Sequence, residues 1–333
     1  MNASATACRA WTWHAPGEPE QLQPGKPPIV SPGPGEIVVR NTMIALNPVD
    51  WKVIAAPPDG WKPGHVPGVD GVGIVTAVGD GVSLPIGTRV AYHQALGKPG
   101  SFADYTTVDI ACVQLVPDGV GDESAAGIPC PGLTAWQALA KVPDIPNRDV
   151  LVTGAGGAVS LILAQLASRR NWRVWVTASP AHRDRLLALG IAGTFDYRTE
   201  DWRDQLGAAL GPRRLFAAFD TTNAAYARGL APLLGYNGHL VCIQDRLDAS
   251  PMPPFTTALS LHEVALNSAH AHATAEDWRD WRRAGANLLD AVRTGALDLQ
   301  QHIVTAFDDL PASLSALKHG RITGRKILVR TRE

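Results

Sequence analysis

The sequence is short of the residues that would indicate a disulfide-bonded or zinc-ribbon protein. Its 333 residues include four cysteines, and no two of them are close enough to form a CxxC pair. A disulfide framework is not expected in a chain of this length with so few cysteines. We interpret all four as small buried apolar residues: Cys8, Cys112, Cys130 and Cys242.

Three further absences narrow the class of protein. The N-terminal residues lack the continuous apolar segment of a secretion signal, and no apolar run is long enough to span a membrane. The formal net charge is −1, and no basic run provides an electrostatic footprint for nucleic acid. We therefore expect a cytoplasmic protein that acts on a small-molecule substrate, with neither a nucleic acid nor a membrane as its partner.

The residues that are present indicate two domains. The composition is 45% hydrophobic and 18% charged, which is ordinary for a globular chain, and 333 residues suffice for two domains or for one inserted into another. The first third is rich in glycine and proline between short β-branched runs. Residues 36–40, 73–78 and 88–92 read as strands bounded by turns, which is typical of a small, irregular β-barrel or sandwich.

The pattern changes after a helical stretch at residues 124–140, which we expect to bridge to a second domain. Strands are predicted at 149–153, 173–177, 193–197, 215–220 and 238–243, with helices at 161–170, 180–189 and 201–210 between them. Alternating strands and helices favour a parallel, doubly wound sheet. A helix at 276–294 and a final strand at 325–330 follow, and His262, His270 and His272 are expected in a loop before that helix.

A glycine-rich segment lies between the first of these strands and the first helix. It reads Gly154-Ala155-Gly156-Gly157-Ala158-Val159-Ser160. Small residues allow the backbone to approach a pyrophosphate, and a helix N-terminus offers unpaired N–H groups and positive dipole. We predict a dinucleotide site at Gly154, Gly156, Gly157, Ala158, Val159 and Ser160. The Ser160 side chain is expected either to push the turn outward or to help hold a phosphate.

The end of the second strand distinguishes NAD from NADP. An NAD enzyme commonly has a carboxylate there to hold the ribose diol, but the segment 177–183 contains none before Asp184. Ser179 and Arg183 suit a 2′-phosphate instead, the arginine as a fork-shaped cation. The simpler interpretations are a helix cap for Ser179 and a solvated helix face for Arg183. We predict NADPH as the cofactor.

Two motifs in the first third carry a family resemblance. The segment 67–79 resembles the catalytic-domain signature of medium-chain alcohol dehydrogenases, with Val69 where zinc-dependent members carry a histidine ligand. Residues 47–52 resemble the "NPxDxK" segment of zinc-free reductases, with Asn47 at the position of a cysteine ligand. Only the third ligand position keeps its thiol, as Cys130, and one thiol does not make a zinc site. The resemblance implies a chain without catalytic metal.

Further similar segments at 100–105 and 235–238 extend the resemblance over nearly the whole chain. The chain is identified as a member of the zinc-independent medium-chain dehydrogenase/reductases, quinone-oxidoreductase-like branch. The resemblance implies an α/β fold, in which a GroES-like β-rich catalytic domain (1–123 and 303–333) contains an inserted Rossmann doubly wound parallel-sheet domain (124–302). It also implies a homodimer, and it adds Thr134, Tyr197, Thr222 and Ile243 to the cofactor site.

The expected chemistry follows from the absence of a Lewis acid. Polarising an isolated ketone without one is difficult, whereas a quinone or a C=C bond conjugated to a carbonyl is already electrophilic. The developing oxyanion then needs only hydrogen bonds and a proton. We predict an NADPH-dependent reductase of quinones or α,β-unsaturated carbonyls. The alternatives are a zinc-free carbonyl or alcohol dehydrogenase with a protein proton donor, and a low-turnover NADPH-binding sensor or crystallin-like protein.

Candidate residues for this chemistry are few. Asn47 is a candidate hydrogen-bond donor, and Asp50 is either catalytic or a carboxylate that organises the loop. Proton delivery falls to water, the cofactor ribose, Tyr92 or His93. Two tryptophans flank the expected site and suit a flat pocket for a conjugated substrate, although packing alone also explains them: Trp51 and Trp61.

Overall fold

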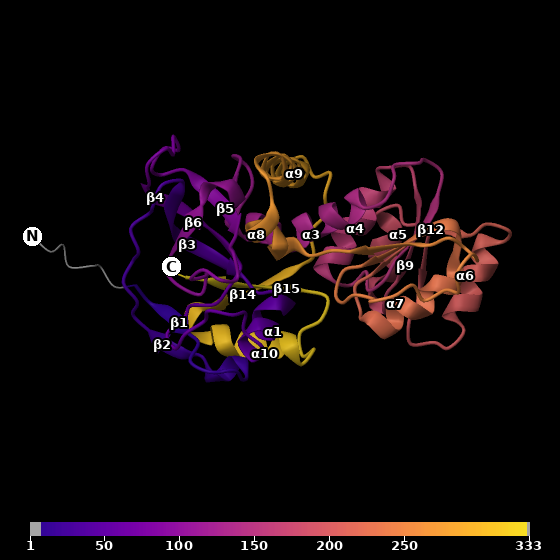
Figure 1. Ribbon diagram of the computed structural model, residues 1–333, viewed down its shortest axis with the longest axis horizontal. Helices are drawn as coiled ribbons and strands as arrows, with labels where there is room; N and C mark the ends of the chain where they lie inside the picture. The colour runs from indigo at the N-terminus through magenta and orange to yellow at the C-terminus, as the bar shows by residue number, and fades with distance from the viewer. Residues whose placement is uncertain (1–7, 332–333) are drawn as a thin grey trace, which may run out of the picture. The chain divides into compact units, whose positions relative to one another are not determined.

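The computed structural model describes residues 8–331 and divides the chain into two compact units (Figure 1). Unit 1 comprises Met1–Cys130 and Asn267–Glu333, and unit 2 comprises Pro131–Leu266. These limits differ from the boundaries expected at residues 123 and 302. The difference at the second boundary arises because helix α9 (Ala275–Arg293) packs on unit 1, against β7 (Val113–Leu115) and the 3-10 turn Ile110–Cys112.

Unit 1 is built on a seven-stranded sheet, in the order β14-β15-β3-β4-β5-β7 with β6 paired to β3. Its strands are β3 (Glu36–Ala45), β4 (Asp70–Val78), β5 (Arg89–His93), β6 (Tyr105–Asp109), β7, β14 (His302–Ala306) and β15 (Lys326–Arg330). A separate two-stranded sheet pairs β1 (Ala10–Thr12) with β2 (Gln23–Gly25). The strands predicted at 36–40, 73–78, 88–92 and 325–330 are confirmed. Strand β15 pairs antiparallel with β3, so the last strand does return to the first domain.

Helices complete unit 1, and α9 is the longest of those that the structure describes. They are α1 (Pro48–Ala55), α2 (Asp122–Ala126), α8 (Ala269–His272), α9 and α10 (Leu310–Lys318). The helix predicted at 124–140 is in fact two helices, α2 and α3 (Pro129–Ala140). The break falls at Ile128, because a residue that precedes a proline is disfavoured in the helical region.

Unit 2 is a parallel sheet in the order β10-β9-β8-β11-β12-β13. Its strands are β8 (Asp149–Val152), β9 (Arg173–Thr177), β10 (Gly193–Phe195), β11 (Leu215–Asp220), β12 (Leu234–Cys242) and β13 (Ser260–Glu263). Counted along the chain, this order is 3-2-1-4-5-6, the arrangement of the dinucleotide-binding doubly wound fold. The predicted doubly wound sheet is therefore confirmed.

The helices of unit 2 are α4 (Ala158–Ser168), α5 (Arg183–Ala188), α6 (Trp202–Leu210) and α7 (Ala224–Leu230). Helices α6 and α7 bury Leu206 and Leu230 in one cluster with Leu151, Ala218 and Leu240 of the sheet. The helix predicted at 180–189 begins as a 3-10 turn and becomes α-helical only at α5. Ser179 occupies its N-cap position, but the hydroxyl makes no cap bond.

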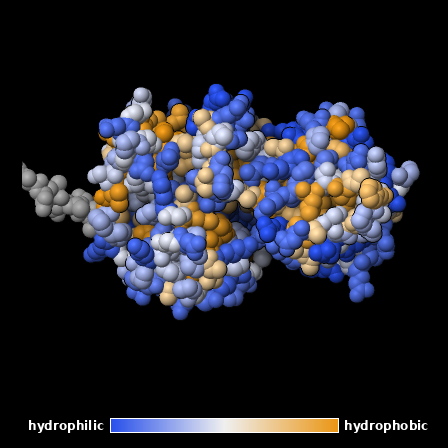
Figure 2. Space-filling view, in the orientation of Figure 1, coloured by the Kyte–Doolittle hydropathy of each residue, from blue (hydrophilic) through white to orange (hydrophobic). Residues whose placement is uncertain are grey.

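The face of the molecule shown in Figure 2 is mainly hydrophilic. On the face shown in Figure 2, each unit carries separated hydrophobic patches among hydrophilic residues, as is normal for a folded domain. None of the helices among residues 8–331 combines the length and the apolar character that crossing a lipid bilayer requires.

Candidate active site

The glycine turn of unit 2 follows β8 and leads into α4. Gly154 has φ of 65°, and a Cβ atom there would lie 2.9 Å from the hydroxyl of Thr221, so both the backbone and the space require glycine. Gly157 is the N-cap of α4 and provides no side chain to cap it. The N–H groups of the first turn, from Ala158 to Ser160, therefore remain available to an anion.

Ser160 does not have the phosphate-binding role expected of it. Its hydroxyl is buried and donates to the carbonyl oxygen of Thr153 at 2.7 Å, with the hydroxyl of Thr221 at 3.0 Å. The side chain lies on the face of α4 that packs against the sheet, so it ties the helix to β8 and to the end of β11. The prediction that Ser160 contacts the cofactor through its side chain, or pushes the turn outward, is thus corrected: Ser160 holds the turn in place.

A buried carboxylate, Asp220, organises the strand ends beside this turn. It accepts hydrogen bonds from the Thr153 hydroxyl and from the backbone N–H groups of Thr222 and Asn223, each at 3.1 Å. Burial raises its pKa above the usual range. The N–H of Ile243 donates to the carbonyl of Asp220 at 2.9 Å. Thr222 and Ile243 therefore lie at adjoining strand ends, next to the turn after β8.

The residues expected around the 2′-phosphate lie after β9 and β10. Ser179 is half-buried, while Arg183 and Tyr197 are exposed. No ion pair of Arg183 occurs among residues 8–331, whereas Arg198 is paired with Asp196 at 2.8 Å. Thr134 lies on α3 and is buried. An uncommitted hydroxyl and an uncommitted guanidinium fit an anionic group on a ribose.

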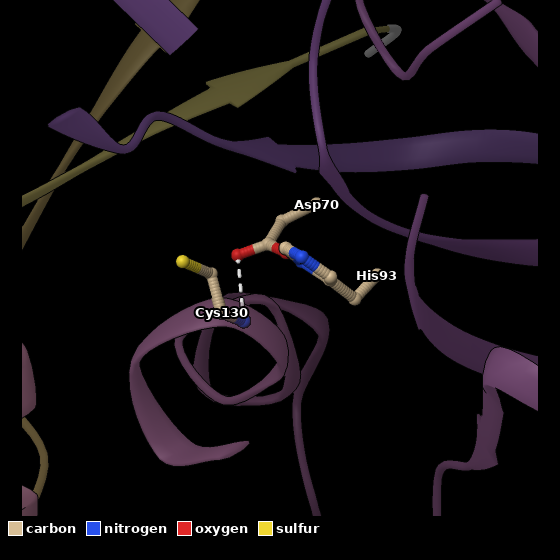
Figure 3. Close-up of side chains that lie close together, drawn as sticks. All are labelled: Asp70, His93 and Cys130. Atoms are coloured by element: carbon tan, nitrogen blue, oxygen red, sulfur yellow. Dashed lines mark hydrogen bonds and ion pairs between the residues drawn. The ribbon is translucent and has the colours of Figure 1, made fainter. Parts of the chain in front are cut away.

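In unit 1, three side chains that can transfer protons or bind a metal lie close together: Asp70, His93 and Cys130. Asp70 begins β4, His93 ends β5, and the two residues lie directly opposite each other in the antiparallel pair. The Nδ1 atom of His93 is 2.8 Å from Oδ1 of Asp70, and both side chains are buried. Figure 3 shows the Asp70 carboxylate pointing toward the start of α3, where the N–H of Cys130 donates to Oδ2 at 3.0 Å.

Asn47 and Lys326 extend this cluster. The Nδ2 group of Asn47 donates to Oδ2 of Asp70 at 2.9 Å and to the carbonyl of Ala45 at 3.1 Å. Its Oδ1 atom accepts a hydrogen bond from the ammonium group of Lys326 at 2.5 Å. Asn47 is 2% exposed and Lys326 8%, so the lysine, the amide and the carboxylate form one buried polar network. The amide of Asn47 is committed within this network.

Asp50 has a structural position rather than the catalytic one considered for it. Its Oδ2 atom accepts from the N–H of Asn47 at 2.7 Å, and its Oδ1 atom accepts from the N–H of Val69 at 3.2 Å. The side chain caps α1 and ties it to the residue before β4. Burial is the main cause that raises the pKa of Asp50 to about 7.

Tyr92 is not placed to deliver a proton, contrary to the expectation for it. Neighbouring residues of a strand face opposite sides of the sheet, so Tyr92 faces away from the side on which His93 meets Asp70. Its ring belongs to a core cluster with Ile37 and Val90, and its hydroxyl donates to Oδ1 of Asn41 at 2.7 Å. Burial raises the pKa of Tyr92 above its usual range, which disfavours the loss of its proton.

The two tryptophans proposed for a substrate pocket have packing roles. Trp61 stacks on His65 with ring centroids 4.0 Å apart, and its indole N–H donates to the carbonyl of Leu96 at 2.7 Å. Trp51 and Trp61 both pack against one hydrophobic cluster of unit 1. The ammonium group of Lys318 lies 5.6 Å from the ring centroid of Trp51. Trp51 and Trp61 thus have packing partners, and their part in a substrate pocket stays a prediction.

Sequence reasoning missed two groups near His93. The rings of His270 and Trp281 lie with their centroids 6.0 and 6.1 Å from that of His93. His270 Nε2 and Trp281 Nε1 are buried and lack a hydrogen-bond partner among residues 8–331. Burial lowers the pKa of His270 to about 4, so its ring is neutral at ordinary pH. A buried donor without a partner costs about 1–3 kcal/mol, which favours a water or ligand atom beside the indole N–H.

The three positions expected to correspond to family zinc ligands do not fit a zinc ion. Val69 is 1% exposed and has no lone pair to offer. Both polar atoms of the Asn47 side chain are already bonded, to Asp70, Ala45 and Lys326. Cys130 alone supplies a ligand atom of the usual kind, and three or four are required.

A cavity of about 1110 Å³ lies elsewhere in unit 1, between the N-terminal end of the described chain and β14. Its charged lining is paired: Arg9 with Asp104 at 3.1 Å, and Arg330 with Glu123 at 3.0 Å. None of the predicted site residues lines this cavity.

Comparison with known proteins gives consistent relatives. The profile of the alcohol dehydrogenase GroES-like domain matches residues 33–118. The chain is 29% identical over 318 residues to the trans-enoyl reductase ACTTS2 of Alternaria alternata, covering 88% of this chain and 90% of that protein. It is 30% identical over 238 residues to the trans-enoyl reductase tndF of Aspergillus flavipes, covering 66% of this chain and 67% of the relative.

Among solved structures, a putative NADPH:quinone reductase from Bacillus thuringiensis superposes with a TM-score of 0.86 at 23% identity. The superposition covers 98% of this chain and 99% of that one. At this level of identity the likeness establishes the fold, which agrees with the two units described above.

Proposed function

Since the chain belongs to the medium-chain dehydrogenase/reductase family, in its quinone-oxidoreductase-like branch, we propose that it is an NADPH-dependent reductase of activated double bonds. It would transfer hydride to a quinone or to the β-carbon of an α,β-unsaturated carbonyl without using zinc. The observation that carries this proposal is the buried Asp70–His93 pair, whose carboxylate is also bonded to Asn47 and Cys130, two of the three expected ligand positions.

The Asp70–His93 pair supports proton delivery by His93. A neutral imidazole donates its Nδ1–H to the carboxylate and has Nε2 as an acceptor, whereas a protonated one has Nε2–H as a donor. Asp70 fixes the orientation of the His93 ring, while Asn47 and the N–H of Cys130 hold Asp70. Proton transfer from a positioned side chain contributes about 10²–10⁴ in rate.

The class of electron acceptor that we propose follows from the chemical groups that the site provides. The chain supplies an acid and buried hydrogen-bond donors, such as the N–H of Trp281, rather than a Lewis acid. Those groups suffice for an acceptor that is electrophilic by conjugation. The trans-enoyl reductases among its relatives and the quinone reductase among the similar structures agree with this class of acceptor.

The cofactor proposal rests on unit 2. When bound, NADPH supplies the hydride. The open N–H groups at the start of α4 suit its pyrophosphate, and Ser179 with Arg183 suits its 2′-phosphate. No carboxylate occurs between the end of β9 and Asp184 to hold a ribose diol, as an NAD-specific site would need.

The test is a panel assay of NADPH oxidation, with quinones, enals, enones and simple ketones at matched concentrations. We expect turnover with the conjugated acceptors and rates at least about 100-fold lower with plain ketones, with no change after treatment with a chelator. Rapid, chelator-sensitive oxidation of aliphatic alcohols would contradict the proposal. NADPH binding without turnover on any acceptor would instead favour a cofactor-binding protein that is not a reductase.

A further inference from the structure

Asp70, His93 and Cys130 have a second property that proton delivery does not explain. Each offers one ligand atom, and the carboxylate oxygen, the imidazole nitrogen and the Sγ atom all lie within 4.8 Å of one another. We propose that these three side chains form a binding site for one zinc ion, and that the ion inhibits the enzyme by occupying the proton-delivery pair. The inhibitory part rests on the function proposed above.

The ligand set differs from the one that the family resemblance implies. Two of the three positions in that set, Asn47 and Val69, cannot bind the ion for the reasons given above. Asp70 is the neighbour of Val69 in the chain, and His93 lies opposite Asp70 on β5. The residue after Val69, Asp70 at the start of β4, thus provides a carboxylate, and its partner His93 on β5 provides an imidazole. Both lie next to the Cys130 thiol (Figure 3).

The geometry is close to what zinc needs. Bonds of about 2.3 Å to sulfur and about 2.0–2.2 Å to nitrogen and oxygen place tetrahedral ligand atoms roughly 3.2–3.8 Å apart. His93 Nδ1 and Asp70 Oδ1 are 2.8 Å apart, which is shorter than that range, and no two of the three ligand atoms are more than 4.8 Å apart. Binding the ion therefore requires rotation of these side chains. Three protein ligands leave a fourth position for water, as in zinc sites that exchange.

The donor types select the ion. A thiolate together with an imidazole suits zinc, whereas magnesium and calcium prefer oxygen ligands alone. The thiolate and the carboxylate neutralise the two charges of the ion, so a neutral complex is buried. The Lys326 ammonium group, bonded to Asn47, opposes this attraction and keeps the site weaker than a dedicated structural zinc site.

Binding and proton delivery are mutually exclusive. When the ion binds, the Cys130 thiol loses its proton to solvent, and the proton that Nδ1 of His93 shares with Asp70 must leave or move to Nε2. The hydrogen bond at 2.8 Å is then replaced by two bonds to the metal. With its nitrogen bonded to the ion, His93 no longer forms the hydrogen-bonded pair with Asp70 on which the proposed proton delivery depends.

The direct test uses cobalt as a spectroscopic probe. Chelator-treated protein is titrated with Co²⁺, and we expect one equivalent to produce visible bands of tetrahedral cobalt and a near-ultraviolet thiolate-to-cobalt band, both removed by excess Zn²⁺. C130S should lose the thiolate band, and D70N and H93Q should weaken binding by about 100-fold or more, since even the partners of ligands contribute about 10–100-fold. Buried Cys242 in unit 2 provides the control C242S, which should keep the band.

Circular dichroism and NADPH affinity establish that each variant is folded. Absence of the thiolate band in the folded wild-type protein, or its persistence in C130S, would overturn the site. The inhibitory part is tested separately: Zn²⁺ should abolish NADPH-dependent reduction, EDTA should restore it, and C130S should need about 10-fold more Zn²⁺ for the same loss. Cobalt binding without loss of rate would overturn the inhibition alone. If no acceptor is reduced at all, the proposed function fails while the cobalt spectrum still decides the site.

Discussion

In each unit a buried aspartate lies at the centre of a polar network, Asp70 in unit 1 and Asp220 in unit 2, and the two networks differ in their partners. Asp70 in unit 1 meets an imidazole, an amide and a backbone N–H beside a thiol. Asp220 in unit 2 meets one threonine hydroxyl and two backbone N–H groups. Asp70 and Asp220 are equally buried, at 0% and 1% exposure, yet only the partners of Asp70 include an ionisable side chain, the imidazole of His93.

This comparison teaches that burial of a carboxylate does not by itself indicate catalysis. Asp220 is satisfied by groups that only position the backbone, and it shapes the strand ends around the glycine turn. Asp70 is bonded to the imidazole of His93, which we propose as the proton donor, and it orients that ring. A buried acid is therefore a candidate for catalysis only when a titratable partner completes it.

The largest expected effect separates these two roles. D70N should lower kcat for an enone or quinone by about 100-fold, because His93 loses the carboxylate that orients it, while NADPH affinity changes little. H93Q should lower kcat to a similar extent. Steady-state kinetics together with an NADPH titration measure both quantities.

D220N is the matched control in the other unit. It leaves the backbone N–H groups of Thr222 and Asn223 with a poorer acceptor, so NADPH affinity should fall by about 10-fold while kcat at saturation is largely kept. Loss of kcat in D220N with retained kcat in D70N would reverse the comparison.

Arg183 tests the cofactor proposal for unit 2. R183A should raise the Kd of NADPH by about 10-fold and leave that of NADH nearly unchanged, because only NADPH has the phosphate that a guanidinium binds. Arg185 on the same short helix provides the control R185A. An unaltered preference in R183A, or equal affinities for the two cofactors in the parent protein, would contradict the proposal.

A substitution of Ser160 tests whether its hydroxyl fixes the glycine turn without contacting the cofactor. S160A removes the bonds to the Thr153 carbonyl and the Thr221 hydroxyl, and it should lower the free energy of unfolding by about 1–2 kcal/mol. NADPH affinity should fall by no more than about 10-fold, since the backbone N–H groups remain. Ser168, at the other end of α4, gives S168A as the control, because its hydroxyl bonds only within the helix. A greater loss of affinity with unchanged stability would indicate direct contact between Ser160 and phosphate.

The smallest expected effect concerns acid stability. Burial lowers the pKa of His65 from 6.5 to about 4, so the folded protein holds this ring neutral. The associated stability is complete above pH 6.5 and is lost as pH falls through 4, because the unfolded chain takes up the proton first. H65F should keep the stack on Trp61 and flatten this part of the stability curve, measured by urea unfolding at several pH values. The exposed His272 provides H272Q, which should leave the curve as it is.

Much of the fold could be predicted because local signals and tertiary packing agree. The strands at 173–177 and 215–220 match β9 and β11 residue for residue, since each is a buried β-branched or apolar run between turn residues. Gly154 was predicted because small residues allow the backbone to approach a pyrophosphate, and the structure adds a second reason for glycine, a φ of 65°. The helix expected at 124–140 was wrong in its continuity, because the effect of Pro129 on Ile128 was not taken into account.

The candidate site was less predictable, because its geometry depends on strand pairing. Tyr92 and His93 are adjacent in sequence, and only the register of β5 against β4 decides which of them meets Asp70. Lys326 is distant in sequence from Asn47, and its role arises from the return of β15 to β3. The sequence contained one signal for this role, because Lys326 is a charged residue at the start of an otherwise apolar strand. His270 was expected in a loop but lies in α8 beside His93, a placement that no local pattern encodes.

The direct opposition of Asp70 and His93 across β4 and β5 links the formation of this pair to the zipping of a hairpin. Closing the hydrogen-bonded ladder brings acid and imidazole together without any ligand, so the pair is assembled as soon as the chain has folded. Residues added between Val78 and Arg89 would lengthen the connection and leave the pair intact. A single residue deleted inside either strand would turn one of these two side chains to the opposite face and abolish the pair.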